Sequence, residues 1–243
     1  MAYRSISQNT TQSSSLVVTP PSGIVDGDIL IAWAVSDAAT GSISWPAGFT
    51  EMSGSPLRST WSNQSLYVAL KVASSESGNY TLTATGGAIV GGVLAVSGRE
   101  ASVTPHRSSA VANNNGNGTP WTITSDAFAS ATSSTCDIIW IAGSDAGDGP
   151  VTHTPPAGMT ERADISVDFA LHTTVATQDA VGSGATGALA GSGACAGAQA
   201  GWDVYAIALA DLSAPPSGDP VIEELAWYPM PIMAQRRTVT VFA

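Results

Sequence analysis

The sequence predicts an all-β chain: a jelly-roll-like β-sandwich built from two duplicated sets of strands, with an extended C-terminal arm. Three observations favour this fold class. No segment of the 243 residues keeps a helical period of apolar residues. Short apolar or alternating segments recur instead, separated by turns rich in glycine, proline and asparagine, as in sandwiches. The order of these segments also repeats in the second half of the chain.

The strongest strand signal is the run Ile-Leu-Ile-Ala-Trp-Ala-Val at residues 29–35, which follows the tight turn Asp26-Gly27-Asp28. Its unbroken branched and aromatic residues predict a strand that is buried on both faces in the middle of the core. A short first strand is expected at residues 15–19, where Pro20 and Pro21 end it. After a turn at residues 45–50, residues 65–72 alternate as a half-buried strand does.

The rest of the first half follows the same logic. A Gly-Asn turn leads into a strand at residues 80–85, and an apolar run at residues 88–98 closes the half. Within that run, Gly91 and Gly92 indicate a bulge or a close approach of two backbones. Residues 100–120 are interpreted as a linker-like crossing that ends in residues 113–120, which have little helix or strand preference. Extended structure restarts at residues 121–124.

Four correspondences in one order indicate a duplication. Pro46-Ala47-Gly48 returns as Pro156-Ala157-Gly158 with an offset of 156 − 46 = 110, and Ser36-Asp37-Ala38 returns as Ser144-Asp145-Ala146 with an offset of 144 − 36 = 108. Val72-Ala73 and the strand at residues 93–96 have weaker counterparts. The Gly/Ala/Ser-rich residues 181–194 occupy the place of the strand at residues 80–85.

The predicted domain is therefore a sandwich over residues 1–212, with half-repeats at about 15–100 and 119–212. In the preferred arrangement both halves contribute strands to both sheets. Two separate tandem sandwiches are the alternative, because each half has the size of a small sandwich domain.

Composition excludes some partners. Hydrophobic residues make up 44% and charged residues 11% of the chain, which suits a packed domain with a neutral Ser/Thr/Gly surface. The formal net charge is −11 and no basic cluster exceeds Arg236-Arg237, so neither nucleic acid nor an anionic membrane is an expected partner. The N-terminus has no apolar signal segment and no run reaches membrane-spanning length, so a soluble protein made in the cytoplasm is expected.

Residues 213–243 form a linker and then an apolar arm. A tail this apolar is expected to dock on its own domain, a neighbouring subunit or a larger assembly. Residues 238–242 alternate as a strand that adds to an exposed sheet edge. The predicted partner-binding residues of the arm are Trp227, Tyr228, Met230, Ile232, Met233, Val239, Val241 and Phe242.

No catalytic, cofactor or metal site is predicted, and the chain is not expected to be an enzyme. Five carboxylates that could serve acid/base chemistry show no pairing pattern and are interpreted as solvated loop residues: Asp145, Asp148, Glu161, Asp164 and Asp168. The three histidines, His106, His153 and His172, form no metal motif. The oxygen-rich segment 144–149 lacks EF-hand spacing, so a turn is preferred to a calcium site. No Gly-x-Ser-x-Gly elbow marks a serine hydrolase.

Cysteines and tryptophans are mainly assigned to packing. Cys136 is interpreted as a small buried apolar residue, with a disulfide to Cys195 as the alternative. Four of the seven tryptophans are assigned to the core or to turns: Trp33, Trp45, Trp140 and Trp202. Trp61 and Trp121 are the candidates for stacking on sugar rings.

Four segments together resemble a pattern common in tailed-phage virion proteins. They are Val25-Asp26-Gly27-Asp28-Ile29-Leu30-Ile31-Ala32, Pro46-Ala47-Gly48-Phe49-Thr50, Leu66-Tyr67-Val68-Ala69-Leu70-Lys71-Val72 and Val93-Leu94-Ala95-Val96-Ser97-Gly98. The resemblance covers roughly residues 15–212, and Phe49 stands where the pattern usually has tryptophan. The motif is scaffold, because its glycines and prolines set turns and its apolar residues fill the core.

The resemblance implies a non-enzymatic virion protein assembled in the host cytoplasm. Capsid decoration or cement protein is the first expectation, with the major capsid protein or other virion proteins as partners and a homo-oligomer, trimeric by analogy with capsids. A tail or head-fibre adhesin that binds host surface glycans is the alternative.

Overall fold

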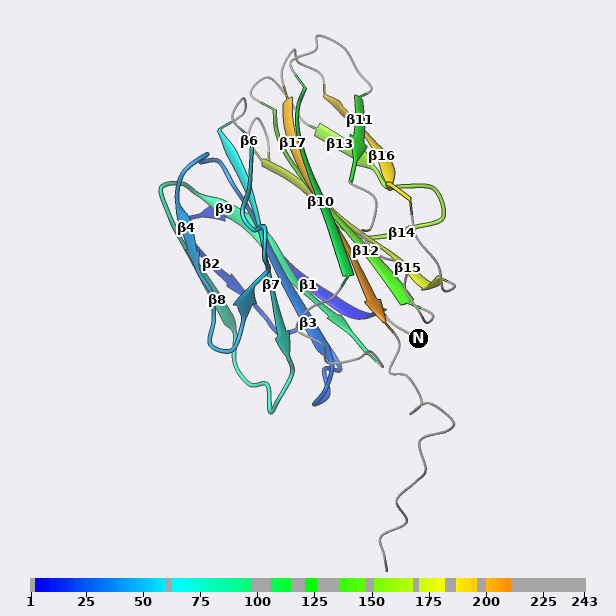
Figure 1. Cartoon of the computed structure of the whole chain (residues 1–243). Coiled ribbons are helices and arrows are strands. Elements are labelled where there is room, and N and C mark those ends of the chain that lie inside the picture. The colour runs from blue at the N-terminus through cyan, green and yellow to red at the C-terminus, as the bar shows by residue number, and fades with distance from the viewer. Residues whose placement is uncertain are drawn as a thin grey trace, which may run out of the picture. The chain divides into compact units, whose positions relative to one another are not determined.

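The computed structural model describes residues 3–59, 63–97, 106–114, 121–125, 136–146, 151–167, 171–181, 187–195 and 200–210. These residues form strands and turns without a helix, which confirms the predicted all-β class (Figure 1). Nothing in the described ranges is a helix with the length and apolarity of a membrane span. We call residues 3–97 the first half and residues 106–210 the second half.

The first half contains nine strands among its described residues. They are β1 (Tyr3–Ser13), β2 (Ser15–Val18), β3 (Ile29–Ser36), β4 (Ser42–Ser44), β5 (Thr50–Glu51), β6 (Leu57–Ser59), β7 (Gln64–Val72), β8 (Tyr80–Thr85) and β9 (Ile89–Val96). The described second half adds β10 (His106–Asn114), β11 (Trp121–Thr124), β12 (Cys136–Ala146), β13 (Val151–Thr154), β14 (Thr160–Ser166), β15 (Leu171–Val181), β16 (Ala190–Cys195) and β17 (Ala200–Ala210).

Each half builds one large and one small antiparallel sheet. The large sheets have the orders β1-β9-β3-β7-β5, with β6 also on β7, and β10-β17-β12-β15-β14. The small sheets have the orders β2-β8-β4 and β11-β16-β13. Taken in chain order, the two halves use the same topology, which confirms the duplicated strand sets.

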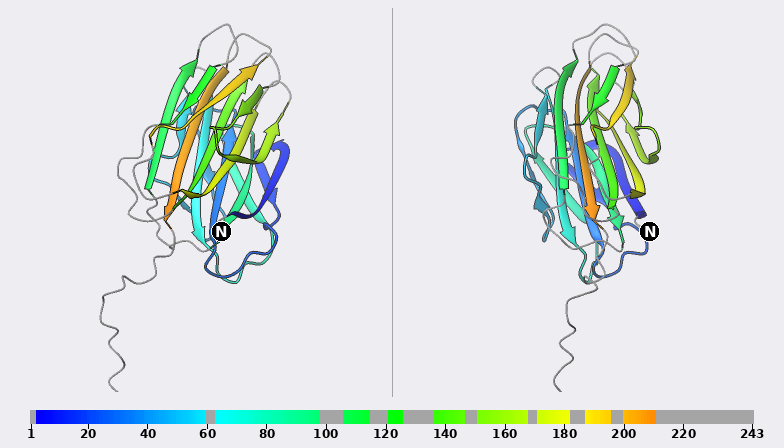
Figure 2. Two further views of the ribbon diagram at one scale, coloured as in Figure 1. Left: turned by 90° about the vertical axis from the view of Figure 1, so that its right-hand side faces the viewer. Right: turned by 45° about the vertical axis from the view of Figure 1, so that its right-hand side comes forward.

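The predicted mixing of the halves within each sheet is wrong. All described pairings join strands of the same half, because each half returns through its own short turns to its own central strand, β3 or β12. Figures 1 and 2 show the first-half strands (blue to blue-green) on one side and the second-half strands (green to orange) on the other. Each half is thus a small sandwich, as in the tandem alternative.

The two small sandwiches nevertheless share one core, where their large sheets pack face to face. Ile31 and Trp33 from β3 belong to the same buried cluster as Ile139 and Ile141 from β12. Strands β14 and β15 contribute further members of this cluster, including Ile165 and Val175. The result is a four-layer body with the small sheets outside, and the residues Met1–Ser213 form one compact unit.

Strand β3, the apolar run with the strongest strand signal in the sequence, packs in two cores. Its odd-numbered residues, such as Ile31, point into the core between the halves, whereas Leu30, Ala32 and Ala34 point to the small sheet β2-β8-β4. Because successive strand residues face opposite sides, a fully apolar run fills two cores at once. All eight residues of β3 are buried, as predicted.

The predicted turns occur in both halves. Phe49 N–H donates to the Pro46 carbonyl at 3.2 Å, and Met159 N–H donates to the Pro156 carbonyl at 3.1 Å. The third turn residue has a φ of 85° at Gly48 and 86° at Gly158, which is the left-handed backbone that a type II turn requires. The repeated Pro-Ala-Gly motif therefore encodes one turn twice.

Gly91 and Gly92 allow a close approach, and the pairing of β9 with β3 continues through them without a bulge. A Cβ at Gly91 would collide with the Trp33 carbonyl oxygen, and one at Gly92 would collide with the Ser7 carbonyl oxygen and the Trp33 ring. Glycine thus leaves room for the buried tryptophan between β9 and its neighbours.

Two strands differ from the prediction. The segment read as a linker-like crossing contains β10, which pairs with β17 over nine residues, His106 with Ala208 through Asn114 with Ala200. Residues before the predicted first strand form β1, an edge strand on β9. Both are polar edge strands, whose backbone pairing leaves little apolar signal in the sequence.

The remaining unit, Ala214–Ala243, contains the predicted arm. All of the arm residues named above lie outside the described residues.

Candidate functional site

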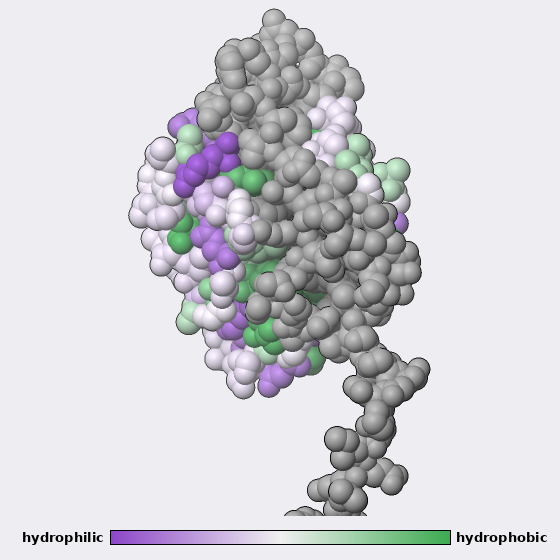
Figure 3. Space-filling model, viewed as in Figure 1, coloured by the Kyte–Doolittle hydropathy of each residue, from purple (hydrophilic) through white to green (hydrophobic). Residues whose placement is uncertain are grey.

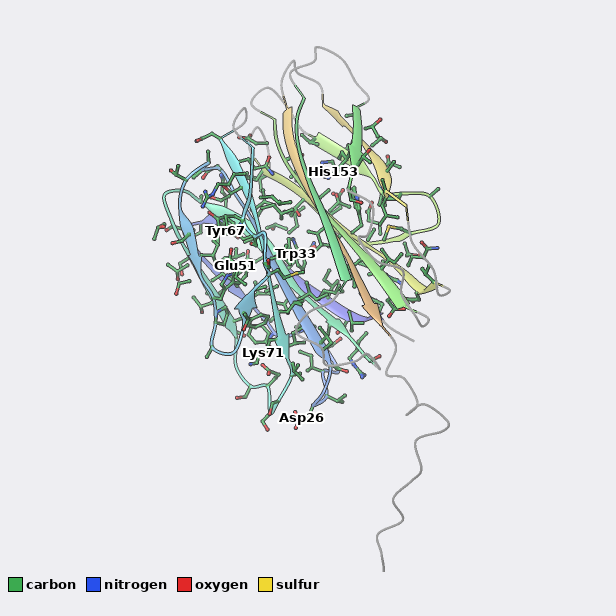
Figure 4. The ribbon with its side chains drawn as sticks, viewed as in Figure 1. Asp26, Trp33, Glu51, Tyr67, Lys71 and His153 are labelled. Atoms are coloured by element: carbon green, nitrogen blue, oxygen red, sulfur yellow. The ribbon has the colours of Figure 1, made fainter. Side chains whose placement is uncertain are left out.

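The densest group of chemically active side chains lies between the two sheets of the second half. We call Ser144 (β12), His153 (β13), Asp164 (β14), His172 and Thr174 (β15) the histidine cluster. Along β13 the burial alternates, so Val151 and His153 face inward while Thr152 and Thr154 face solvent. Figure 4 shows His153 among the second-half strands. The cluster joins the small sheet to the large sheet beneath it.

The two histidine rings are in direct contact. Their centroids lie 4.2 Å apart and the rings are nearly perpendicular, at 83°. His153 is 6% exposed and His172 is 1% exposed. Trp140 packs edge-on to His153, with centroids 6.4 Å apart. The two imidazoles are therefore buried together beside the Trp140 ring.

His172 is tied to a carboxylate. Its Nε2 lies 2.9 Å from Asp164 Oδ1 and 3.1 Å from Thr174 Oγ1. The Thr174 hydroxyl donates to the same Asp164 oxygen at 3.0 Å, so Nε2 of His172 is the protonated nitrogen. Burial alone would raise the pKa of Asp164, but the hydrogen bond and charge of His172 and the Thr174 hydroxyl outweigh burial and lower this pKa.

His153 is held without a carboxylate. Its Nε2 lies 2.8 Å from Ser144 Oγ, and its Nδ1 has no hydrogen-bond partner. Burial lowers the pKa of His153 well below its ordinary value, and the neighbouring His172 lowers it further. His153 is therefore a neutral imidazole in the folded protein.

This geometry does not form a catalytic triad. The Ser144–His153 contact is the kind that activates a serine, but Ser144 has no exposed surface. The carboxylate that would orient a catalytic base, Asp164, binds His172 instead of His153. Within the described ranges, no three His, Cys, Asp or Glu side chains gather as a metal site.

A second polar cluster fastens the first half at the β7–β8 connection. Glu76 accepts from Lys71 Nζ at 2.9 Å and from the Tyr80 hydroxyl at 2.8 Å. The ring of Phe49 meets Tyr80 edge-on at 5.5 Å, so the Pro-Ala-Gly turn is anchored as well. Burial would raise the pKa of Glu76, but its hydrogen bonds, that from Lys71 foremost, lower it. We assign this cluster a structural role. Lys71, one of its members, is labelled in Figure 4.

Asp37 and Asp145, which occupy matching positions of the two halves, interact electrostatically. Asp37 follows β3 and its Oδ1 accepts from Ala88 N–H at 2.7 Å. Burial, and then the charge of Asp37, raise the pKa of Asp145 to about 6. The duplication has thus placed two like charges near each other.

The outer faces of the small sheets are chemically alike. On the first half the outward residues are Ser15, Val17, Ser42, Ser44, Thr81, Thr83 and Thr85, and on the second half they are Thr122, Thr124, Thr152, Thr154, Ala190, Ser192 and Ala194. None of these described residues is charged. The surface over β2, β4 and β8 is accordingly pale on the left of Figure 3.

The predicted site residues have varied outcomes. Asp145, Glu161 and Asp164 lie in strands β12 and β14, so their interpretation as loop residues is wrong. Asp148, Asp168 and Trp61 lie outside the described residues. Trp121 begins β11, but its side chain is not described. Segment 144–149 begins within β12, with residues 147–149 outside the description.

Cys136 and Cys195 lie in strands of different sheets, β12 and β16. The histidine cluster was not predicted, because its members are far apart in sequence and share no motif. The alternation of Val-Thr-His-Thr at residues 151–154 was the available signal that His153 faces inward.

The chain matches no protein-family model, no curated protein and no solved structure. Its function is therefore argued from its own residues.

Proposed function

We propose that this chain is a non-enzymatic structural protein of a bacteriophage virion, a decoration or cement protein that joins the capsid through its apolar C-terminal arm. The four scaffold segments that resemble tailed-phage virion proteins support the proposal. The arm, with Trp227, Tyr228, Val239, Val241 and Phe242 among its apolar residues, would add to a neighbouring subunit or to the major capsid protein.

The observation that carries this proposal is the division of the chain at Ser213. The residues Met1–Ser213 form one compact unit and Ala214–Ala243 form the other. The outward residues of the small sheets are uncharged and most of them carry hydroxyl groups, which suits a protein displayed in water. A hydrophilic compact unit followed in the chain by an apolar segment is the order expected of an anchored surface protein.

The test is deletion of Ala214–Ala243. We expect the truncated protein to keep its β-sheet circular dichroism and thermal unfolding but to be lost from virions assembled without the full-length chain. A double substitution, Val239→Asp with Val241→Asp, keeps the length and should also abolish incorporation; Thr238→Ser with Thr240→Ser is the matched control. Normal incorporation of the truncated protein would refute the anchoring role.

A glycan-binding adhesin of the tail or head fibre is the second candidate. Trp121 begins β11, an edge strand of the small sheet β11-β16-β13, and most of the outward residues of this sheet carry hydroxyl groups. Aromatic faces bind sugar rings through apolar contact, and hydroxyls add hydrogen bonds. A glycan array with wild type, Trp61→Ala and Trp121→Ala decides: binding lost in either variant supports the adhesin, and no binding by the wild type argues against it.

A further inference from the structure

The duplicated halves differ at the positions where the second half carries its histidines. Offset by 110 residues, His153 corresponds to Ile43, which is buried in the first-half core. Register places Ser144 opposite His172 in the second half and Ser36 opposite Ser65 in the first. The first half therefore has isoleucine and serine where the second half has two contacting imidazoles.

The charged and titratable groups around His153 come from few elements. Strand β15 supplies His172, and β14 supplies Asp164 and Glu161. Burial, and then the charge of Asp164, raise the pKa of Glu161, and the charge of His172 opposes this rise. Strand β12 faces the cluster with Ser144 and Trp140. Described residues 190–194 of β16 and 122–124 of β11 carry no charge, and Cys195 ends β16. Asp164, the carboxylate of the cluster, is bonded to His172 and not to His153.

We propose that the histidine cluster makes the small sheet β11-β16-β13 an acid-labile layer, which is held on the large second-half sheet at neutral pH and opens when His153 takes up a proton. A positive charge on His153 would be buried against the His172 ring with no bonded carboxylate. Opening exposes His153 to water, where it is protonated freely. The small sheet of the first half, with Ile43, has no such response.

The expected size of the pH effect on opening of the small sheet follows from proton linkage. The closed layer favours neutral His153, so its contribution to stability is present above the pKa of an exposed histidine, about 6.5, and is lost as the pH falls below it. Uptake of one proton on opening raises the opening equilibrium about 30-fold between about pH 7.5 and about pH 5.0.

Hydrogen exchange followed by mass spectrometry tests the proposal on the full chain. After correction for intrinsic exchange, amides of residues 151–154 and 190–195 should lose about 30-fold in protection over this pH range, whereas residues 80–85 should change little. His153→Ile, which introduces the first-half residue, should remove the pH dependence. His106→Gln is the matched control and should retain it.

Two results would overturn the proposal: protection of β13 and β16 that does not change with pH, or an equal loss in His153→Ile. If that variant fails to fold, an NMR titration of the wild-type histidine rings replaces it. His153 should still be neutral at about pH 6.5, where an exposed histidine is half protonated, and should titrate only as β13 and β16 lose protection. Titration of His153 near pH 6.5 in an intact layer would contradict the proposal.

Discussion

Replacing Asp145 by asparagine should stabilise the folded protein at neutral pH and have no effect in acid. Burial and the charge of Asp37 raise the pKa of Asp145 to about 6 from an ordinary 3.8. The folded state therefore binds this proton more tightly than the unfolded chain does. Stability from this group is fully present below about pH 4 and is lost as the pH rises through about 6. Asparagine resembles the protonated, uncharged form at every pH.

The magnitude of the stabilisation by Asp145→Asn follows from the pKa shift of Asp145. About two pKa units correspond to about 3 kcal/mol, and because Asp145 is only partly buried, solvent screening reduces this to about 1–2 kcal/mol. The assay is the free energy of unfolding in urea, for wild type and Asp145→Asn, across pH 4 to 8. Asp37→Asn removes the charge partner, and the double variant measures the coupling between the two sites. A stability difference that is constant with pH, or a destabilised Asp145→Asn at neutral pH, would refute the reasoning.

Other substitutions test the packing. Gly158→Ala places a Cβ on a left-handed backbone without a close clash, and it should lower the free energy of unfolding in urea by about 1–2 kcal/mol. The control Gly187→Ala has no atom near the new Cβ and no left-handed φ, so it should cost less than half of that. Equal costs would contradict the turn assignment. Ile139→Ala, in the core between the halves, should cost about 2–5 kcal/mol and keep a single unfolding transition in calorimetry; two transitions would mean that the halves unfold independently.

The sequence was sufficient to predict elements whose own residues carry the signal. The run at residues 29–35 is apolar at every position, and a strand between two cores is the structure that uses such a pattern. The Pro-Ala-Gly turns need only local hydrogen bonds and one glycine. The small-residue segment at 181–194, interpreted as the equivalent of residues 80–85, contains all of β16 except its last residue, Cys195. Strand β16 is the central strand of its sheet, as β8 is of the other small sheet.

Elements that depend on distant partners were not predictable in the same way. Strand β10 is polar and is fixed by backbone hydrogen bonds to β17, nearly a hundred residues away in sequence. The mixing of halves within sheets was wrong because alternation tells which face is buried, not which strand lies beside it. The histidine cluster requires four strands of two different sheets to meet, and neither the spacing nor the composition of the sequence indicates that they do.

The two halves use one scaffold twice, yet neither is expected to be stable by itself. Separation would expose the odd-numbered face of β3, including Ile31 and Trp33, together with Ile139 and Ile141 on β12. Such a surface is far more apolar than the outer faces, where hydroxyl side chains meet water, and its burial is what holds the halves together. The described residues of the small outer sheets do not contribute to this core between the halves, so they can change without separating the halves. A change such as isoleucine at position 43 against histidine at position 153 can therefore give one outer sheet a response to acid while the shared core, and the fold, stay the same.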